Sequence, residues 1–131
     1  KYERYINYIV NDIELPYLKS LEPYGLKDNE YELVLSKVFN QPLTIKDNYV
    51  FDSNGKIIYS EDSTGYWYKK EYDNQGNLIY SEDSTGYWEK YEYDNTIYFE
   101  NSDGYWRKWE YDINGNIIYS ENSDGYIRDD R

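Results

Sequence analysis

One stretch of sequence decides the fold of this chain: FDSNGKIIYSEDSTGYW, at residues 51–67. The same pattern starts again at Tyr72, in a shortened form at Tyr93, and once more at Tyr111. Repetition at a period of about twenty residues is typical of stacked supersecondary units, each of which contacts its neighbours along the array. The repeat therefore predicts an extended surface rather than a closed pocket.

Each copy contains two short strand patterns, which in the second copy are residues 78–82 and 87–93. The turns between them begin with a polar residue and carry Gly near the end, as in residues 73–77, which is the chemistry of a type I turn with a glycine bulge. Turns this short can join only antiparallel neighbours. We therefore expect residues 51–131 to form an antiparallel β-meander of about eight strands, built from four hairpin repeats.

Alternation along the strands separates two faces of the expected sheet. Tyrosines dominate one face, which we interpret as the core side. The other face carries a tryptophan, a lysine and a glutamate in each of the first three copies. Equivalent strands of neighbouring hairpins lie roughly 10 Å apart, so we expect a ladder of tryptophans on this face, formed by Trp67, Trp88 and Trp106.

Residues 1–50 have helical rather than strand periodicity. Apolar side chains at helical spacing predict a first helix that ends before Pro16; they are Tyr2, Tyr5, Ile6, Ile9 and Ile13. A short helical turn is expected at Leu18 and Leu21. A second long helix is expected from about Asn29 to Phe39, opened by a capping box of Asn29 and Glu32.

The expected fold class is therefore α+β, with two domains. Residues 1–50 form a helical cap, and residues 51–131 form the four-copy repeat sheet. A stacked array exposes an apolar end unless another element covers it, so we interpret the helices as a cover for the first hairpin. The alternative is that they form a separate head that binds a partner.

Charge is concentrated in the repeats. The chain carries a net charge of −12, and residues 51–131 hold eighteen acids against eight bases. Such a surface repels phosphate backbones and attracts basic partners, so we expect a positively charged protein partner and no direct nucleic-acid binding. The simpler alternative is that the acids keep an aromatic-rich sheet soluble.

Cysteine and histidine are both absent from the sequence. Disulfides, thiolate nucleophiles, histidine-dependent zinc sites and imidazole acid–base chemistry are therefore excluded. Every acid sits in a duplicated position, and no unique carboxylate pair suited to catalysis stands out. We expect no enzyme activity, no catalytic residues, no metal and no cofactor.

The sequence has no apolar run long enough to span a membrane and no signal-peptide pattern at its start. We expect a cytoplasmic protein of a bacterial host cell that does not engage membranes. The alternative is an extracellular or surface location, if a signal has been removed.

The repeat resembles the YD repeat of RHS-type and teneurin-type proteins, in which a Gly is followed by Tyr-Asp, two variable residues, Gly and an aliphatic residue. Residues 65–78 carry the pattern, and it recurs at Tyr111, Asp112, Gly115 and Ile117. The resemblance covers about 80 residues and implies stacked β-hairpins. In that family the repeats build long strips that wind into shells or bind glycans at cell surfaces. Four copies are too few to enclose a cavity, so only the strand-and-turn architecture carries over.

Two sets of side chains are candidates for binding a partner. The first is a repeated acidic turn, whose regularly spaced carboxylates could imitate the phosphates of a nucleic-acid strand; it comprises Glu61, Asp62, Glu82, Asp83, Glu100, Asp103, Glu121 and Asp124. The second is the tryptophan ladder, because exposed indoles stack on sugars or anchor protein interfaces. Turn chemistry explains the first set equally well, and cross-strand packing or burial beneath the helices explains the second.

From these sets we hypothesise a non-catalytic acidic protein-binding module. Its form would be a phage or mobile-element inhibitor that docks, as a monomer or a dimer, on the basic surface of a nucleic-acid-processing or defence enzyme. The alternative is a cell-surface or wall-associated repeat that binds glycans through the tryptophan ladder. A third hypothesis is a structural repeat or assembly subunit.

Overall fold

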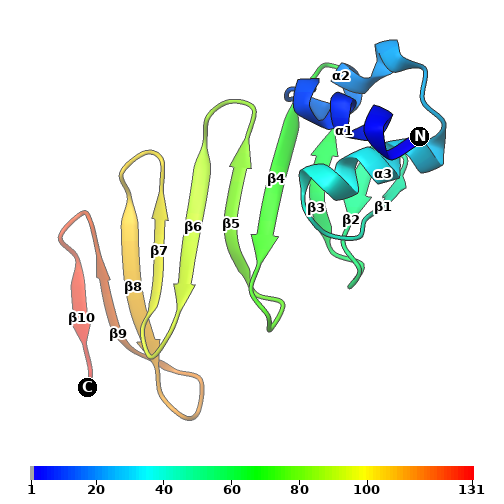
Figure 1. The fold of residues 1–131 in the computed structure, drawn as a ribbon. Coiled ribbons are helices and arrows are strands. Elements are labelled where there is room, and N and C mark those ends of the chain that lie inside the picture. The colour runs from blue at the N-terminus through cyan, green and yellow to red at the C-terminus, as the bar shows by residue number, and fades with distance from the viewer. Residues whose placement is uncertain (1) are drawn as a thin grey trace. The chain divides into compact units, whose positions relative to one another are not determined.

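The computed structural model describes residues 2–131, with side chains from Tyr5 onward (Figure 1). The α+β class and the antiparallel meander are confirmed. The helices are α1 (Tyr2–Asp12), α2 (Tyr17–Leu21), the 3-10 helix η1 (Glu22–Tyr24) and α3 (Asp28–Val38). The strands are β1 (Thr44–Lys46), β2 (Tyr49–Phe51), β3 (Ile57–Glu61), β4 (Trp67–Tyr72), β5 (Leu78–Asp83), β6 (Trp88–Tyr93), β7 (Ile97–Asn101), β8 (Trp106–Tyr111), β9 (Ile117–Asn122) and β10 (Ile127–Asp129).

The sheet has ten strands in chain order, rather than about eight. Strands β3 to β10 belong to the repeats, β1 precedes them, and β2 ends at Phe51, the first residue of the first copy. A two-residue turn at Asp47 and Asn48 joins β1 to β2, with Asp47 at a positive φ of 56°. Each of these strands is three residues long, which is too short for alternation along the strand to reveal it.

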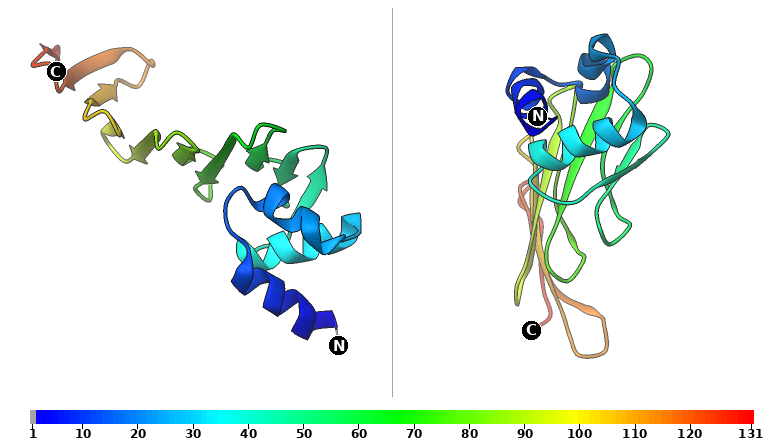
Figure 2. Two further views of the ribbon diagram at one scale, coloured as in Figure 1. Left: turned by 90° about the horizontal axis from the view of Figure 1, so that it is seen from above. Right: turned by 45° about the vertical axis from the view of Figure 1, so that its right-hand side comes forward.

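The chain forms two compact units, which divide within β4 between Lys69 and Lys70. In the first unit the helices lie together on one side of β1 to β3 (Figures 1 and 2). Between the helices and these strands lies an apolar core, which consists of Ile6, Ile9, Leu21, Val34, Leu35, Leu43 and Val50, with the ring of Tyr59. The side chain of Tyr2, expected on the apolar stripe of α1, lies outside the described residues.

The helices cover the tryptophan face in this unit, which reverses the expected assignment of the core side. Glu61 pairs directly with Trp67, and Tyr59 with Lys69, so these four side chains share one face. Tyr59 and Glu61 contact α2, whereas Tyr68 pairs with Ser60 on the other face. Both faces alternate aromatic and polar side chains, so periodicity alone does not show which one the helices select.

The cap of α3 also differs from the expectation. The helix begins at Asp28, so Asn29 is already inside its first turn, and Glu30 accepts the backbone N–H of Lys27 at 3.0 Å. Glu32, the expected partner of Asn29, instead accepts the N–H of Ile45 at 2.8 Å. It therefore ties α3 to β1.

The repeated turns have the predicted type I geometry with a glycine bulge. At the turn between β3 and β4, the N–H of Gly65 donates to the carbonyl of Asp62, and the N–H of Asp62 donates to the carbonyl of Tyr66. Gly65 has a φ of 93°, which favours glycine. The carboxylate of Asp62 accepts the N–H groups of Thr64 and Tyr66. The same backbone arrangement recurs at every turn of the repeat that contains a glycine, whereas the turn between β6 and β7, at residues 94–96, has no glycine and is shorter.

The second unit, from Lys70 to Arg131, contains strands and turns but no helix. Ser120 is the only residue of this unit that is buried, and the aromatic rings on both of its faces are half-buried or exposed. The unit therefore has no apolar layer of the kind that helices and strands enclose in the first unit.

Candidate partner-binding surface

The tryptophan face repeats one arrangement of four side chains, which we call the Tyr-Glu cluster. A tyrosine and a glutamate stand two residues apart on one strand, and a tryptophan and a lysine lie opposite them on the next. In the first cluster the rings of Tyr59 and Trp67 stack with centroids 6.5 Å apart and planes at 25°. The ammonium of Lys69 lies 5.6 Å from the Trp67 ring centroid.

The first cluster holds the start of helix α2. Glu61 accepts the N–H of Leu18 at 2.8 Å with one carboxylate oxygen and the N–H of Lys19 at 2.6 Å with the other. The hydroxyl of Tyr59 accepts the N–H of Tyr17 at 3.0 Å and donates to Glu61 at 2.6 Å. Three successive N–H groups of the helix are therefore bound by two side chains of the sheet.

These side chains supply a cap that α2 lacks. Pro16 stands at its N-cap position, no side chain of the helix caps it, and its first turn has no acidic residue. The first N–H groups of a helix have no acceptor within the helix, and a carboxylate there also interacts well with the helix dipole. Tyr59 and Glu61 are 0% and 5% exposed, so this cap lies in the core.

Burial is the main reason that the pKa of Tyr59 is raised, and the hydrogen bond to Glu61 raises this pKa further. The hydroxyl therefore keeps its proton and remains a donor to the carboxylate. The ring of Tyr59 also packs against Tyr17 at 5.4 Å and Phe39 at 5.9 Å between centroids.

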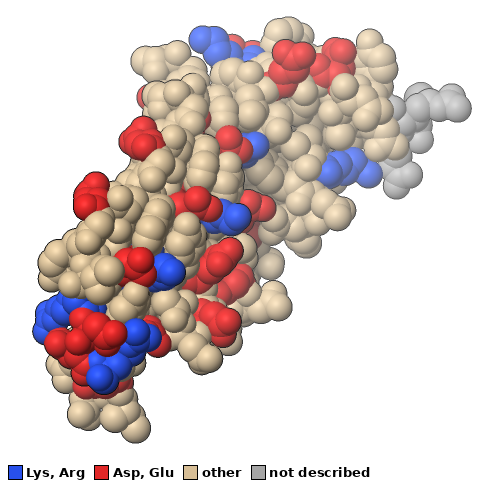
Figure 3. Space-filling view, turned by 90° about the vertical axis from the view of Figure 1, so that its left-hand side faces the viewer, with Lys and Arg blue, Asp and Glu red and all other residues tan. Residues whose placement is uncertain are grey.

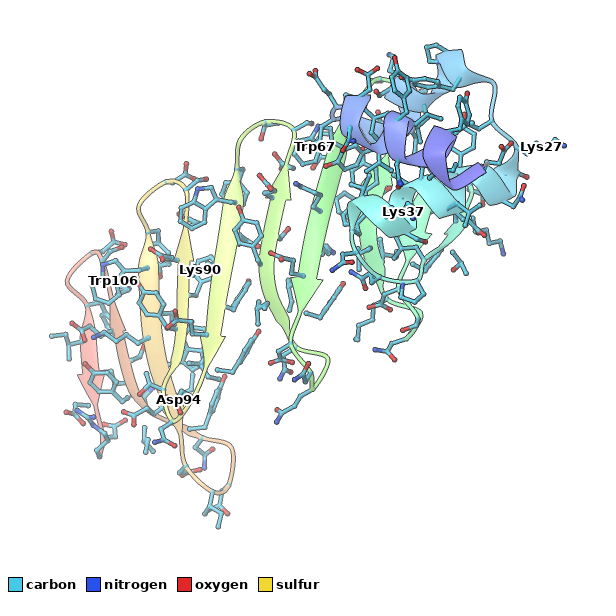
Figure 4. The ribbon with its side chains drawn as sticks, in the orientation of Figure 1. Lys27, Lys37, Trp67, Lys90, Asp94 and Trp106 are labelled. Atoms are coloured by element: carbon cyan, nitrogen blue, oxygen red, sulfur yellow. The ribbon has the colours of Figure 1, made fainter. Side chains whose placement is uncertain are left out.

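The third cluster reproduces the rings of the first in the second unit. Tyr98 and Trp106 stack with centroids 6.4 Å apart and planes at 21°. The ammonium of Lys108 lies 5.5 Å from the Trp106 ring centroid. Glu100 pairs directly with Trp106 across the strands. Figure 4 shows Trp106 at the start of β8, as Trp67 is at the start of β4.

The second cluster has the same strand register, with Tyr80 opposite Lys90 and Glu82 opposite Trp88. Burial raises the pKa of Tyr80. This cluster therefore has the same four residue types in the same positions as the third.

In the fourth cluster, an arginine of the same chain covers the tyrosine ring. Tyr119 donates to Glu121 at 2.6 Å, as Tyr59 does to Glu61. This hydrogen bond, with the nearby ammonium of Lys108, holds the pKa of Glu121 low. Ile127 replaces the tryptophan, and the guanidinium of Arg131 lies 4.0 Å from the Tyr119 ring centroid.

The eight acids predicted to bind a partner fall into three groups. The first group is the four glutamates of the Tyr-Glu clusters, of which Glu61 is buried beneath α2; the others are Glu82, Glu100 and Glu121. Asp62 and Asp83 hold their own turns by accepting N–H groups. Asp103 and Asp124 are exposed, and their carboxylates accept no hydrogen bond from any described residue. The acids therefore do not form one uniform row.

The three tryptophans of the predicted ladder are all half-buried. Trp67 lies in the first unit against the buried ring of Tyr59, so cross-strand packing accounts for it. Trp88 and Trp106 lie in the second unit, on the same face of their strands. Each backbone N–H donates to a serine hydroxyl, Ser102 for Trp88 and Ser123 for Trp106, at 3.1 Å.

The Tyr-Glu pairing was not identified as a site from the sequence, although a signal was present. Each copy has a tyrosine followed two residues later by a glutamate, at Tyr59, Tyr80, Tyr98 and Tyr119. A two-residue interval places both side chains on one face of a strand. What the repeat alone does not reveal is that the first pair accepts backbone donors from a helix.

Acidic and basic side chains are interspersed on the surface that Figure 3 shows. One depression in the first unit, of about 410 Å³, is lined by Leu18, Glu22, Asp28, Tyr31, Ile45 and Asp47. Among the side chains that the structure describes, from Tyr5 onward, no group of three or more acidic side chains is arranged to hold a metal ion. Among the described helices, none is long and apolar enough to cross a membrane.

Comparison with known proteins finds no match: no family model fits the chain, and no curated protein is significantly similar to it. The resemblance to YD repeats stays a prediction.

Proposed function

We propose that this protein is a non-catalytic acidic module that binds a positively charged protein partner through its second unit. The observation that carries the proposal is the sheet of β5 to β10, which has exposed or half-buried aromatic rings on both faces and no buried apolar side chain. Half-exposed aromatic rings are the side chains that most often anchor protein interfaces.

Charge supports a basic partner. Residues 70–131 carry fifteen acids and six bases. The acids at Asp94, Asp103 and Asp124 are exposed in turns, and their carboxylates accept no hydrogen bond within the described chain. They are free to meet lysines and arginines of a partner, and opposite charges of this kind accelerate and orient protein association. A groove that binds nucleic acid is a surface of the required charge, so we propose a nucleic-acid-processing or defence enzyme as the partner.

Glycan binding remains the second proposal, and the tryptophan rings give it less support. A sugar needs the open face of an indole ring to stack on. The Trp106 ring is stacked against Tyr98, and the ammonium of Lys108 lies over it. A bound sugar would have to displace that lysine.

Capture from bacterial lysate tests the first proposal. The immobilised protein is exposed to lysate, and bound proteins are released with a short DNA duplex and identified by mass spectrometry. We expect basic nucleic-acid enzymes, released by DNA and lost at high salt because charge dominates such contacts. A variant with Asp94→Lys, Asp103→Lys and Asp124→Lys should capture little, and the matched Asn variant an intermediate amount. Capture of the same proteins by all three, or release by a soluble glycan instead of DNA, would contradict the proposal.

A further inference from the structure

The contact between α2 and the first Tyr-Glu cluster shows what such a cluster can bind. Its ligand is the first turn of a helix, whose N–H groups of Tyr17, Leu18 and Lys19 point at the sheet. The aromatic side chain at the first helical position packs on the tyrosine of the cluster. The chain therefore contains one occupied example of a site that it repeats.

We propose that the third cluster, formed by Tyr98, Glu100, Trp106 and Lys108, binds the N-terminal turn of a helix from a partner protein. The proposal rests on the proposed function only in that the ligand is another protein. It adds the structural element of that partner which the sheet recognises.

The third cluster has the acceptors in place and unused. Its ring stacking differs from that of the first cluster by 0.1 Å in centroid distance and 4° in plane angle, and its lysine-to-indole distance by 0.1 Å. Glu100 is half-buried, and its carboxylate accepts no hydrogen bond from any described residue. The hydroxyl of Tyr98 likewise has no hydrogen bond within the described chain. A hydrogen bond that an ionised carboxylate accepts from a backbone N–H at a helix start is roughly twice as strong as a neutral one, and Lys90, opposite Glu100 on β6, forms no hydrogen bond with it within the described chain.

The two helices with described caps are not available as ligands for this site. The start of α2 is bound by Glu61, and the start of α3 is capped by Glu30. The fourth cluster shows the opposite case, in which the chain's own Arg131 covers the tyrosine ring. Within the described chain, the third cluster has neither a helix start bound to its glutamate nor an arginine over its tyrosine ring. We therefore assign its ligand to another molecule.

The chemistry of the ligand follows from α2. The helix should lack Ser, Thr, Asp or Asn at its N-cap position, because such a residue would already satisfy the free N–H groups. Its first position should carry an aromatic side chain that reaches Tyr98. The negative charge of Glu100 interacts favourably with the positive end of the helix dipole. This contact and the acidic turns therefore both favour a partner surface of positive potential.

A peptide titration of the isotope-labelled full-length protein, followed by NMR, tests the proposal. The probe is an alanine-rich helical peptide that begins acetyl-Pro-Tyr-Leu-Lys, the sequence at the start of α2. We expect shifts at the Glu100 carboxyl carbon, the Tyr98 ring and the Trp106 indole. A peptide with Asp in place of Pro caps itself and should bind about fivefold more weakly, which is the effect of one helix cap.

Two variants and one control separate this site from a nonspecific effect. Glu100→Gln should weaken binding of the first peptide by about fivefold, since it replaces a charged acceptor, and Tyr98→Phe should weaken it by a smaller factor. Glu89→Gln is the matched control, because Glu89 accepts from Tyr87 at 2.9 Å on the opposite face. It should leave binding unchanged.

Several results would overturn the proposal. They are the absence of shifts at the highest soluble peptide concentration, equal binding of the two peptides, and equal effects of Glu100→Gln and Glu89→Gln. Shifts at Glu100 that arise when the protein alone is concentrated would assign the site to a second copy of this chain instead. The titration involves none of the turn acids tested in the lysate, so the two proposals can fail separately.

Discussion

At the scale of single residues, a carboxylate and an amide perform the same task in the repeated turns. Asp73 and Asp112 each accept two backbone N–H groups of their own turn. Asn101 and Asn122 accept the equivalent N–H groups in their turns with an amide oxygen. The turn therefore needs a short side chain with an acceptor oxygen, and it does not need a charge.

Acid titration should detect the charged members of this set. Hydrogen bonds lower the pKa of Asp62, chiefly from Thr64, and those of Asp73 and Asp112, chiefly from the N–H groups of Asn77 and Asn116. Because these pKa values lie below the unfolded value near 4, the folded state binds fewer protons. The resulting stability is fully present above about pH 5 and is lost as pH falls through the folded pKa values.

The test is the melting temperature between neutral and strongly acidic pH. A variant with Asn at positions 62, 73 and 112 should keep its turns at pH 7 and lose less stability in acid than the parent. The control carries Asp94→Asn, Asp103→Asn and Asp124→Asn, which removes the same charge from side chains that hold no turn. An acid profile of the control as flat as that of the first variant would show that net charge, and not the turns, sets the acid stability.

At the scale of elements, one cluster joins the sheet to the helices. Glu61 and Tyr59 bind α2, and Glu32 ties α3 to β1. Both acids lie in elements whose other side chains pack in the same core. The first unit therefore depends on buried polar contacts as well as on its apolar side chains.

Replacing Glu61 by Gln should destabilise the protein by about 2 kcal/mol, because buried N–H groups lose a charged acceptor. Tyr59→Phe should cost about 1 kcal/mol, the value of an ordinary hydrogen bond. Since the two side chains bond to each other as well as to α2, the double variant should cost less than the sum. Urea unfolding at neutral pH measures all three values.

The control for this pair is Tyr119→Phe with Glu121→Gln, which changes the same residue types where no helix is bound. Its effect should be clearly smaller than that of the first-cluster variants. Equal losses at the two clusters would mean that the Tyr-to-Glu hydrogen bond, and not the helix contact, provides the stability.

The elements that the sequence predicted best are those with internal repetition. The strands of the second copy, expected at residues 78–82 and 87–93, are β5 and β6. The type I turns are also present, because Asp, Asn and Gly set local geometry without help from the rest of the fold. The predicted cap of α3 was wrong by two residues, because the N-cap is Lys27 and not Asn29. Asn29 and Glu30 are both compatible with a helix start. Only the position of β1 explains why Glu32 accepts the N–H of Ile45 instead of capping the helix.

At the scale of the molecule, the sequence predicted a helical region and an antiparallel meander, but not the face that the helices cover. That choice depends on Tyr59 and Glu61, which differ in no visible way from Tyr80 and Glu82 in the second copy. The partner of a repeated side chain is a tertiary property. The candidate site was therefore present in the sequence as a pattern, and its ligand was visible only in the first unit of the structure.

The two units should differ in local stability, because only the first encloses an apolar core. Amide protection against hydrogen exchange depends on the free energy of local opening, which rises with buried apolar contact. Among strand amides we expect the slowest exchange at Val50 and Tyr59, whose side chains are fully buried. Backbone amides of β6 to β9 should exchange faster, although they are bonded in the same kind of antiparallel ladder.

Hydrogen exchange measured by NMR on the full-length protein at neutral pH tests this difference. The comparison uses strand amides that are hydrogen-bonded in both units, so that intrinsic exposure of the backbone does not decide the result.

If a partner helix binds the third cluster, protection of β7 and β8 should rise when the acetyl-Pro-Tyr-Leu-Lys peptide is added, because a ligand of the folded state opposes opening. Equal protection in both units without ligand would contradict the prediction. It would show that the ladder and half-buried rings alone stabilise the second unit as strongly as a core.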